Sequence, residues 1–125
     1  MTTFDLETTY LGLDGAGEVK PLPVGPDFWA TIDRNPDLRA NLVAVFGGEG
    51  DWPSWEMHPQ GDEVLILLEG SMQMVFDRPH EPEIIFMAPG TTVIVPAGVW
   101  HRGVDQRGAK LLAITYGAGT DHRPA

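Results

Sequence analysis

The chain has no cysteine, few basic residues and no long apolar run. The lack of cysteine excludes a disulfide framework, a thiolate metal site and a cysteine nucleophile, so any bound metal must use nitrogen and oxygen donors. The longest aliphatic run, Val64 to Leu68, is too short to cross a membrane, and residues 1–10 lack the basic and apolar regions of a signal peptide. We therefore expect a soluble, cytoplasmic protein that does not bind membranes.

The charge balance is strongly acidic, with 8 basic against 18 acidic residues and a formal net charge of −10 at pH 7. This charge repels phosphate backbones and anionic lipids, and no basic cluster stands out along the chain. Nucleic acid is therefore not an expected partner. The simplest role of the acidity is solubility.

Glycine and proline are abundant, with 15 and 11 residues scattered among short apolar runs. This spacing is typical of many tight turns and favours an all-β over a helical architecture. A chain of 125 residues that is 42% hydrophobic can bury a core of its own without disulfides. We expect one domain.

Alternating polar and apolar residues predict a series of short strands. The expected strands are 3–10, 38–46, 54–58, 63–69, 71–76, 84–87, 91–95 and 109–116. We also expect a chain reversal at Gly70, one helical turn over 27–32, and a frayed, glycine-rich tail after residue 116. Many short strands separated by turns are typical of a sandwich or barrel, and a double-sheet jelly roll is one way to protect their edges.

Two segments carry ordered sets of glycine, proline, histidine and acidic residues. They read Gly50-x5-Glu56-x-His58-x4-Glu63-x6-Gly70 and Gly90-x5-Pro96-x-Gly98-x2-His101-x3-Asp105. Together they resemble the paired motifs of the cupin superfamily, small β-barrels that hold a metal ion inside; they cover roughly half of the chain. Glu56 stands where the family usually has its first histidine. The resemblance implies an all-β fold, the cupin double-stranded β-helix or jelly-roll barrel, with one cupin domain over 1–125, a barrel core over 38–116 and an N-terminal arm over 1–37.

The resemblance implies a metal site, and carry-over by position gives its ligands as Glu56, His58, Glu63 and His101. Residues two apart in a strand point to the same side, so Glu56 and His58 can both face the barrel interior. Imidazole and carboxylate donors suit a divalent ion such as iron, manganese, zinc or nickel. If Glu56 coordinates, the site holds two carboxylates; if it turns away, three ligands remain and the site is more open. Without a metal, the same residues would form a hydrogen-bonded polar cluster in the core.

Other polar and aromatic residues have weaker claims to a role. Tyr116, on the last expected strand, is a candidate proton donor, whereas His80 and His122 are expected to be solvated bystanders. Three tryptophans lie beside the motifs: Trp52, Trp55 and Trp100. They either line a pocket or pack in the core.

Two apolar strand faces carry further expectations. By the family's pattern, one apolar face lines the cavity; it consists of Met72, Met74 and Phe76. If Glu63 points inward, a second set of apolar residues points out of the barrel: Val64, Ile66 and Leu68. Another subunit or the N-terminal arm must cover this set, and we expect a homodimer.

Two main functions are consistent with this sequence. One is a metal-dependent enzyme, dioxygenase-like or isomerase/lyase-like, that acts on a small molecule. The alternative is a non-catalytic cupin module that binds a small molecule or a metal, and a barrel with a vestigial site is a third. No residue arrangement is specific to one reaction, and the fold hosts many. The barrel leaves no room in 125 residues for a DNA-binding segment, so we do not expect a complete transcription regulator.

Overall fold

The computed structural model describes residues 2–31 and 41–125, and strands make up most of it. The strands are β1 (Thr9–Leu13), β2 (Val19–Pro23), β3 (Asn41–Gly50), β4 (Ser54–Met57), β5 (Glu63–Phe76), β6 (Glu83–Met87), β7 (Thr92–Val95), β8 (His101–Tyr116) and β9 (Asp121–Pro124). One helical turn, α1 (Phe28–Thr31), follows β2. The start of the expected strand 38–46 and the end of the expected turn 27–32 lie outside the described residues. The all-β prediction is confirmed.

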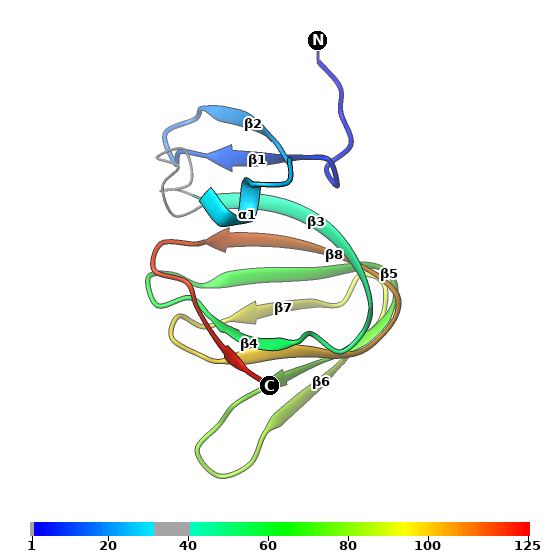
Figure 1. Cartoon of the computed structure of the whole chain (residues 1–125). Coiled ribbons are helices and arrows are strands. Elements are labelled where there is room, and N and C mark those ends of the chain that lie inside the picture. The colour runs from blue at the N-terminus through cyan, green and yellow to red at the C-terminus, as the bar shows by residue number, and fades with distance from the viewer. Residues whose placement is uncertain (1, 32–40) are drawn as a thin grey trace.

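Two long strands, β5 and β8, run through both layers of the barrel. The first half of β5 and the second half of β8 pair with each other and lie between β7 and β3, and β1 and β2 extend this layer. The other halves pair with each other and with β6 and β4, and β9 lies beyond β4. All of these pairs are antiparallel. Figure 1 shows the strands curving round from one layer into the other, which is the expected jelly roll.

The expected chain reversal at Gly70 is wrong, because β5 continues through it as one bent strand. The register between β5 and β8 shifts around this point. Gly70 has a φ of 76°, and a Cβ atom there would lie 2.3 Å from the carbonyl oxygen of Gly108. Only glycine fits this crossing of two backbones, so Gly70 lets β5 change layers while it stays paired with β8.

The N-terminal strand begins later than expected, at Thr9 and not at residue 3. Asp5 closes a turn before it: its carboxylate accepts a bond from the amide of Glu7, and its carbonyl accepts bonds from the amides of Thr8 and Thr9. This local turn competes with the extended conformation that the alternation predicts. β2, which holds two prolines, is the outermost strand of its layer.

The main core lies between the two layers and is made of alternate residues of the long strands and their neighbours. Its buried members are Leu65, Leu67, Met72, Met74, Phe76, Met87, Val93, Val95, Ala109, Leu111 and Ala113. The apolar face of residues 72–76 is therefore buried in the core, and its role in lining a cavity stays a prediction. A second cluster, Tyr10, Leu22, Leu42 and Ala44, packs with Phe28 of α1 and joins β1 and β2 to the barrel.

An apolar row crosses the outer face of the larger layer. Paired positions on five strands place these residues side by side: Ile94, Val64, Ile114, Val43 and Leu11. We call this set the outer row. Ile94 is 65% exposed, whereas Val64 and the neighbouring Ile66 are half-buried and Leu68 is 41% exposed. The homodimer stays a prediction.

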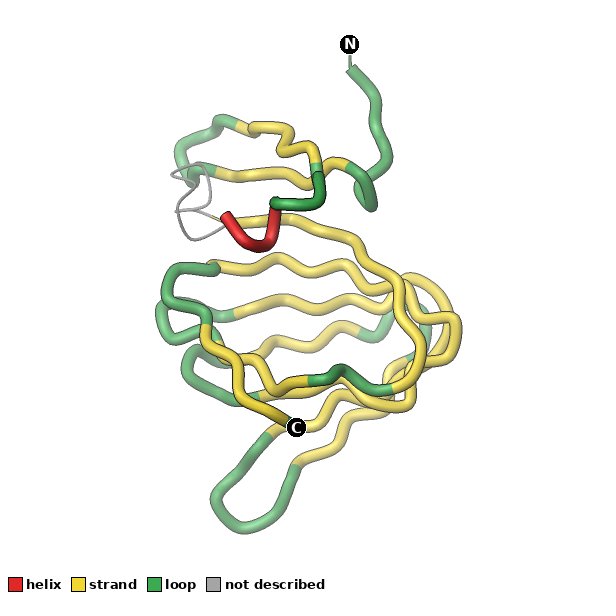
Figure 2. The backbone as a smooth tube through the Cα atoms, in the orientation of Figure 1, coloured by secondary structure: helices red, strands yellow, loops and turns green. Residues whose placement is uncertain are grey.

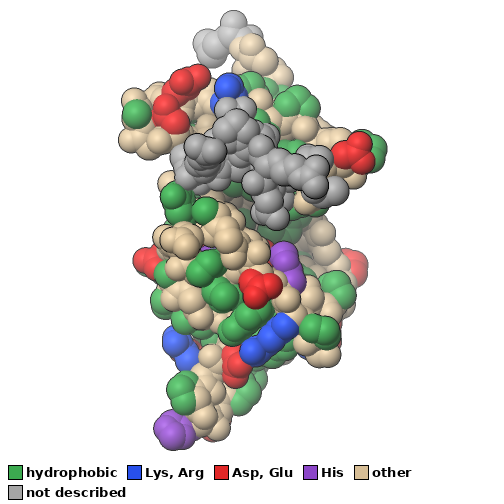
Figure 3. Space-filling view, turned by 60° about the vertical axis from the view of Figure 1, so that its left-hand side comes forward, with side chains coloured by type: hydrophobic (Ala, Val, Ile, Leu, Met, Phe, Trp, Pro, Cys, Tyr) green, Lys and Arg blue, Asp and Glu red, His purple; other side chains and the backbone are tan. Residues whose placement is uncertain are grey.

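The C-terminal segment does not fray as expected, because β9 pairs with β4 over four residue pairs. The loop between β5 and β6 instead projects from the barrel, at the lower end of the view in Figure 2. Acidic side chains are scattered over the visible face of the molecule and form no single patch there (Figure 3). Within the described ranges, no helix has the length and apolar character needed to cross a membrane.

Candidate metal centre

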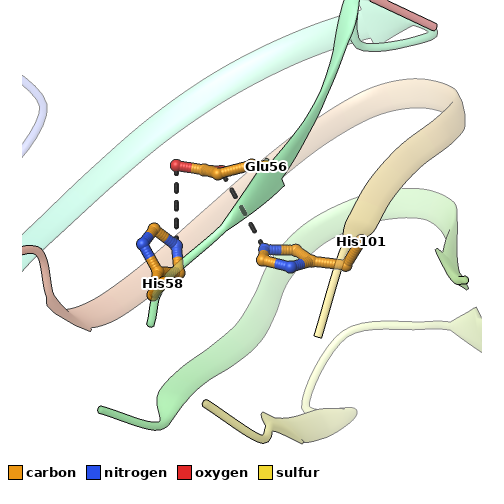
Figure 4. Close-up of side chains that lie close together, drawn as sticks. All are labelled: Glu56, His58 and His101. Atoms are coloured by element: carbon orange, nitrogen blue, oxygen red, sulfur yellow. Dashed lines mark ion pairs between the residues drawn. The ribbon is translucent and has the colours of Figure 1, made fainter. Parts of the chain in front are cut away.

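The structure brings the four predicted ligands together at the ends of three strands. Glu56 lies in β4 opposite His101, the first residue of β8, and His58 directly follows β4. Glu63 is the first residue of β5, which pairs with the other end of β8. Figure 4 shows Glu56 and His58 pointing from β4 toward His101.

The distances between the donor atoms are short. Glu63 lies between the two histidines, with Oε1 3.1 Å from His101 Nε2 and Oε2 3.2 Å from His58 Nε2. Glu56 approaches the same nitrogens from another side, at 3.6 Å from His58 and 3.9 Å from His101. Glu56, His58 and His101 each offer one ligand atom within 4.8 Å of the other two. This group can hold a metal ion, and Glu63 lies beside it in reach of both imidazoles.

The four side chains of the site differ in how deeply they are buried. The relative exposure of His101 is 0%, and that of both His58 and Glu63 is 3%. The side chain of Glu56 is 27% exposed. Within the cluster, Glu56 is therefore the member that solvent reaches.

The buried carboxylate and imidazoles change each other's protonation. Burial alone would raise the pKa of Glu63, but the hydrogen bond from His101 and the positive charge that the neighbouring imidazoles can carry lower it to about 2. Burial likewise would lower the pKa of His101, but its hydrogen bond to Glu63 and the charge of that carboxylate raise it above its ordinary value. Burial, followed by repulsion from Glu63, raises the pKa of Glu56. The pKa values of the two carboxyl groups are therefore shifted in opposite directions.

The donor set fits a metal ion. His58 Nε2 is buried and has no hydrogen-bond partner, although a Glu63 oxygen lies 3.2 Å away. Buried imidazole nitrogens are normally paired, so an unpaired one that faces carboxylates is a ligand-like arrangement. His101 donates from Nδ1 to the carbonyl of Val99 at 3.1 Å, which leaves its Nε2 directed at the cluster.

The role of Tyr116 as a candidate proton donor stays a prediction, and the neighbouring Thr115 contacts the site directly. The Thr115 hydroxyl donates to Glu63 Oε2 at 2.5 Å. Because successive side chains of a strand point to opposite faces, Tyr116 lies on the face away from Glu63. The direction of β8 at this point could be read only from its register with β5.

Two residues of the expected frayed tail also reach the site. Thr120 Oγ1 lies 2.8 Å from His58 Nδ1. His122 pairs with Glu56 across β4 and β9, and its Nε2 lies 3.8 Å from a Glu56 oxygen. His122 is 58% exposed, so the expectation that it is solvated and not a ligand stays a prediction although it borders Glu56. His80 lies exposed in the loop between β5 and β6. No local pattern in the glycine-rich tail indicates these contacts.

The tryptophans have different roles. Trp52 packs against the core, and its ring centroid lies 6.2 Å from that of His101. Trp55 and Trp100 instead flank the guanidinium group of Arg123 in β9, with centroids at 5.4 and 4.6 Å. Trp52 therefore packs beside His101, and the other two anchor the C-terminal strand.

No family model matches the chain. Among curated proteins, it is similar to the uncharacterized protein YdbB of Bacillus subtilis (strain 168), with 35% identity over 60 residues, which are 48% of each chain. The match thus spans about half the length of that relative.

Solved structures resemble the chain over a longer stretch. One is a cupin-2 domain containing protein from Shewanella frigidimarina, with a TM-score of 0.52 and 27% identity over 60% of this chain and 69% of that one. Another is Fe(II)-HppE with the alternative substrate (S)-1-HPP, with a TM-score of 0.50 and 25% identity over 60% of this chain and 42% of that one. Since the jelly roll, both motifs and these structural neighbours agree, we conclude that the chain has the cupin fold.

Proposed function

We propose that this cupin binds a divalent metal ion through Glu56, His58, Glu63 and His101 and uses it to convert a small molecule. The unpaired, buried Nε2 of His58 supports the proposal most directly. This nitrogen faces oxygens of two carboxylates, and such a group of buried polar atoms is unfavourable unless a cation lies among them.

The donor set indicates the kind of metal. Two carboxylates and two imidazoles balance the charge of a divalent ion and suit iron, manganese, zinc or nickel better than soft metals. The similarity to an Fe(II) protein makes iron the first metal to test. When bound, the ion supplies Lewis acidity, and iron adds redox chemistry with dioxygen.

Glu63 and Glu56 have different roles in the proposed site. Glu63, held by hydrogen bonds to Thr115 and His101, keeps the buried end of the site in place. Glu56 stands at the solvent side, and its raised pKa favours a proton on its carboxylate more than in an ordinary glutamate. In a three-ligand site, with Glu56 turned away from the ion, this carboxyl group can exchange a proton with a substrate that enters past it. This arrangement supports dioxygenase-like and isomerase/lyase-like reactions equally.

A non-catalytic binding module is the second candidate function. It is supported by the burial of three of the four donors, because only Glu56 gives solvent access to the cluster. A site closed by protein ligands holds a metal well but leaves little room for a substrate.

Elemental analysis tests the proposal. Untagged wild-type protein, purified without chelator, should contain one metal ion per chain, and His58→Ala should contain almost none. His80→Ala, in the exposed loop, is the matched control and should load as the wild type does. Equal loading of all three proteins would refute the site.

Assays on the loaded protein separate the functions. Dioxygen uptake by the iron form with candidate small molecules would indicate a dioxygenase-like enzyme. Turnover with zinc or manganese and without dioxygen would indicate isomerase or lyase chemistry. Ligand binding without turnover would favour the binding module.

A further inference from the structure

A chain of hydrogen bonds connects the C-terminal segment to His58. The Thr120 hydroxyl donates to the carbonyl oxygen of Gly117 at 2.8 Å. The same hydroxyl oxygen lies 2.8 Å from His58 Nδ1. A hydroxyl group has one proton to donate, so toward His58 this oxygen can only accept. With the Thr120 proton assigned to the Gly117 carbonyl, His58 Nδ1 carries a proton.

This proton determines the state of the other ring nitrogen. A neutral imidazole carries one proton, so with Nδ1 protonated the His58 Nε2 is a free lone pair. That lone pair is buried and lies 3.2 Å from a Glu63 oxygen and 3.6 Å from a Glu56 oxygen. It has the state that a metal ligand requires.

Contacts outside the cluster hold Thr120 in place. Strand β9 starts at the next residue and pairs with β4, which carries Glu56. Arg123 of β9 lies against Trp55 and Trp100 and forms an ion pair with Asp77. In Figure 1, β9 passes along β4 at the C-terminal end of the chain. The hydroxyl is therefore presented to His58 by a docked strand.

We propose that Thr120 is a positioning residue that fixes His58 in the Nδ1-protonated tautomer and thereby sets the metal affinity of the site. This inference rests on the proposed metal binding. On this proposal the C-terminal segment, which lies outside both cupin motifs, contributes Thr120 to the metal centre.

The tautomer can be measured without a metal. Long-range ¹H–¹⁵N correlation spectra of the metal-free wild type, under conditions where His58 is neutral, should show a protonated Nδ1 and an unprotonated Nε2. Thr120→Ser keeps the hydroxyl and should keep this pattern. Thr120→Val has nearly the same shape but no acceptor, and it should shift His58 toward the Nε2-protonated tautomer. A wild-type His58 protonated at Nε2 would overturn the proposal.

Metal affinity gives the second readout. Zn²⁺ titrated in competition with a chromophoric chelator should bind Thr120→Val about 10- to 100-fold more weakly than the wild type, the loss typical of an outer-shell partner of a ligand. Thr120→Ser should restore most of the affinity. If Thr120→Val binds Zn²⁺ as tightly as the wild type, Thr120 has no positioning role and the metal site itself still stands. If the wild type binds no metal, the proposed function fails along with the affinity claim, and the spectra still report the tautomer.

Discussion

Replacement of Glu63 by glutamine in the metal-free protein should remove a pH-dependent part of the barrel's stability. The hydrogen bond from His101 and the charge of the neighbouring imidazoles overcome the effect of burial and lower the pKa of Glu63 from 4.5 to about 2. A carboxyl group whose pKa is lower in the folded chain stabilises the fold above its unfolded pKa, and this contribution disappears as the pH falls toward the folded pKa. The change in pKa corresponds to about 3 kcal/mol in the free energy of unfolding.

The other member of this ion pair, His101, sets the upper limit of the pH range in which the pair stabilises the fold. The pKa of His101 is raised above its ordinary value of 6.5, so its contribution is complete below pH 6.5 and is lost as the pH rises through the folded pKa. The stability difference between wild type and Glu63→Gln should therefore be largest between pH 4.5 and 6.5.

Urea unfolding of chelator-treated protein at a series of pH values measures this difference. Glu69→Gln is the matched control, because Glu69 is 66% exposed and lies 3.7 Å from Lys110 at the surface. That variant should change the free energy of unfolding by less than about 1 kcal/mol. If the wild-type and Glu63→Gln curves stay parallel as the pH falls from 6 to 3, the buried ion pair does not stabilise the fold and the reasoning is refuted.

Three further predictions concern the fold, the site and the assembly. Gly70→Ala should destabilise the protein by about 1–3 kcal/mol in thermal melts, because alanine is strained at positive φ and its Cβ meets the backbone of β8. Glu56→Gln should weaken Zn²⁺ binding about tenfold or more if Glu56 is a ligand, as chelator competition would measure. We expect a homodimer through the outer row, which is uncharged in a chain of net charge −10, so Ile94→Lys should give a monomer in light scattering.

Controls decide each of these cases. Gly15 also has a positive φ, but a Cβ there meets nothing within 4 Å, so an equal loss in Gly15→Ala would show that the backbone crossing at Gly70 is unimportant. Unchanged zinc affinity of Glu56→Gln would remove Glu56 from the ligand set. Phe86→Lys changes an exposed residue outside the outer row and should leave the oligomeric state unchanged. A monomeric wild type would contradict the dimer.

The sequence predicted the parts of the site that repeat along one strand or belong to a motif. Alternation was sufficient to place Glu56 and His58 on the same side of β4, and the second motif supplied His101. Thr115 and Thr120 were missed because their partners are 52 and 62 residues away along the chain. Such contacts follow from strand pairing, which local patterns do not encode.

The errors in the fold have a similar origin. A glycine at positive φ suits both a turn and a bend in a continuous strand, so Gly70 alone could not distinguish the two. The tail was expected to fray because of its glycines, yet the contacts of Arg123 with Trp55 and Trp100 dock it on the barrel. Those contacts depend on the finished fold.

Because β5 and β8 belong to both layers, neither layer can lose its hydrogen bonds without breaking those of the other. The barrel should therefore unfold in a single cooperative step, with fluorescence and circular dichroism transitions that coincide. Amide hydrogens at the centres of these two strands should exchange only through global opening, and those of the outermost β2 through local fraying.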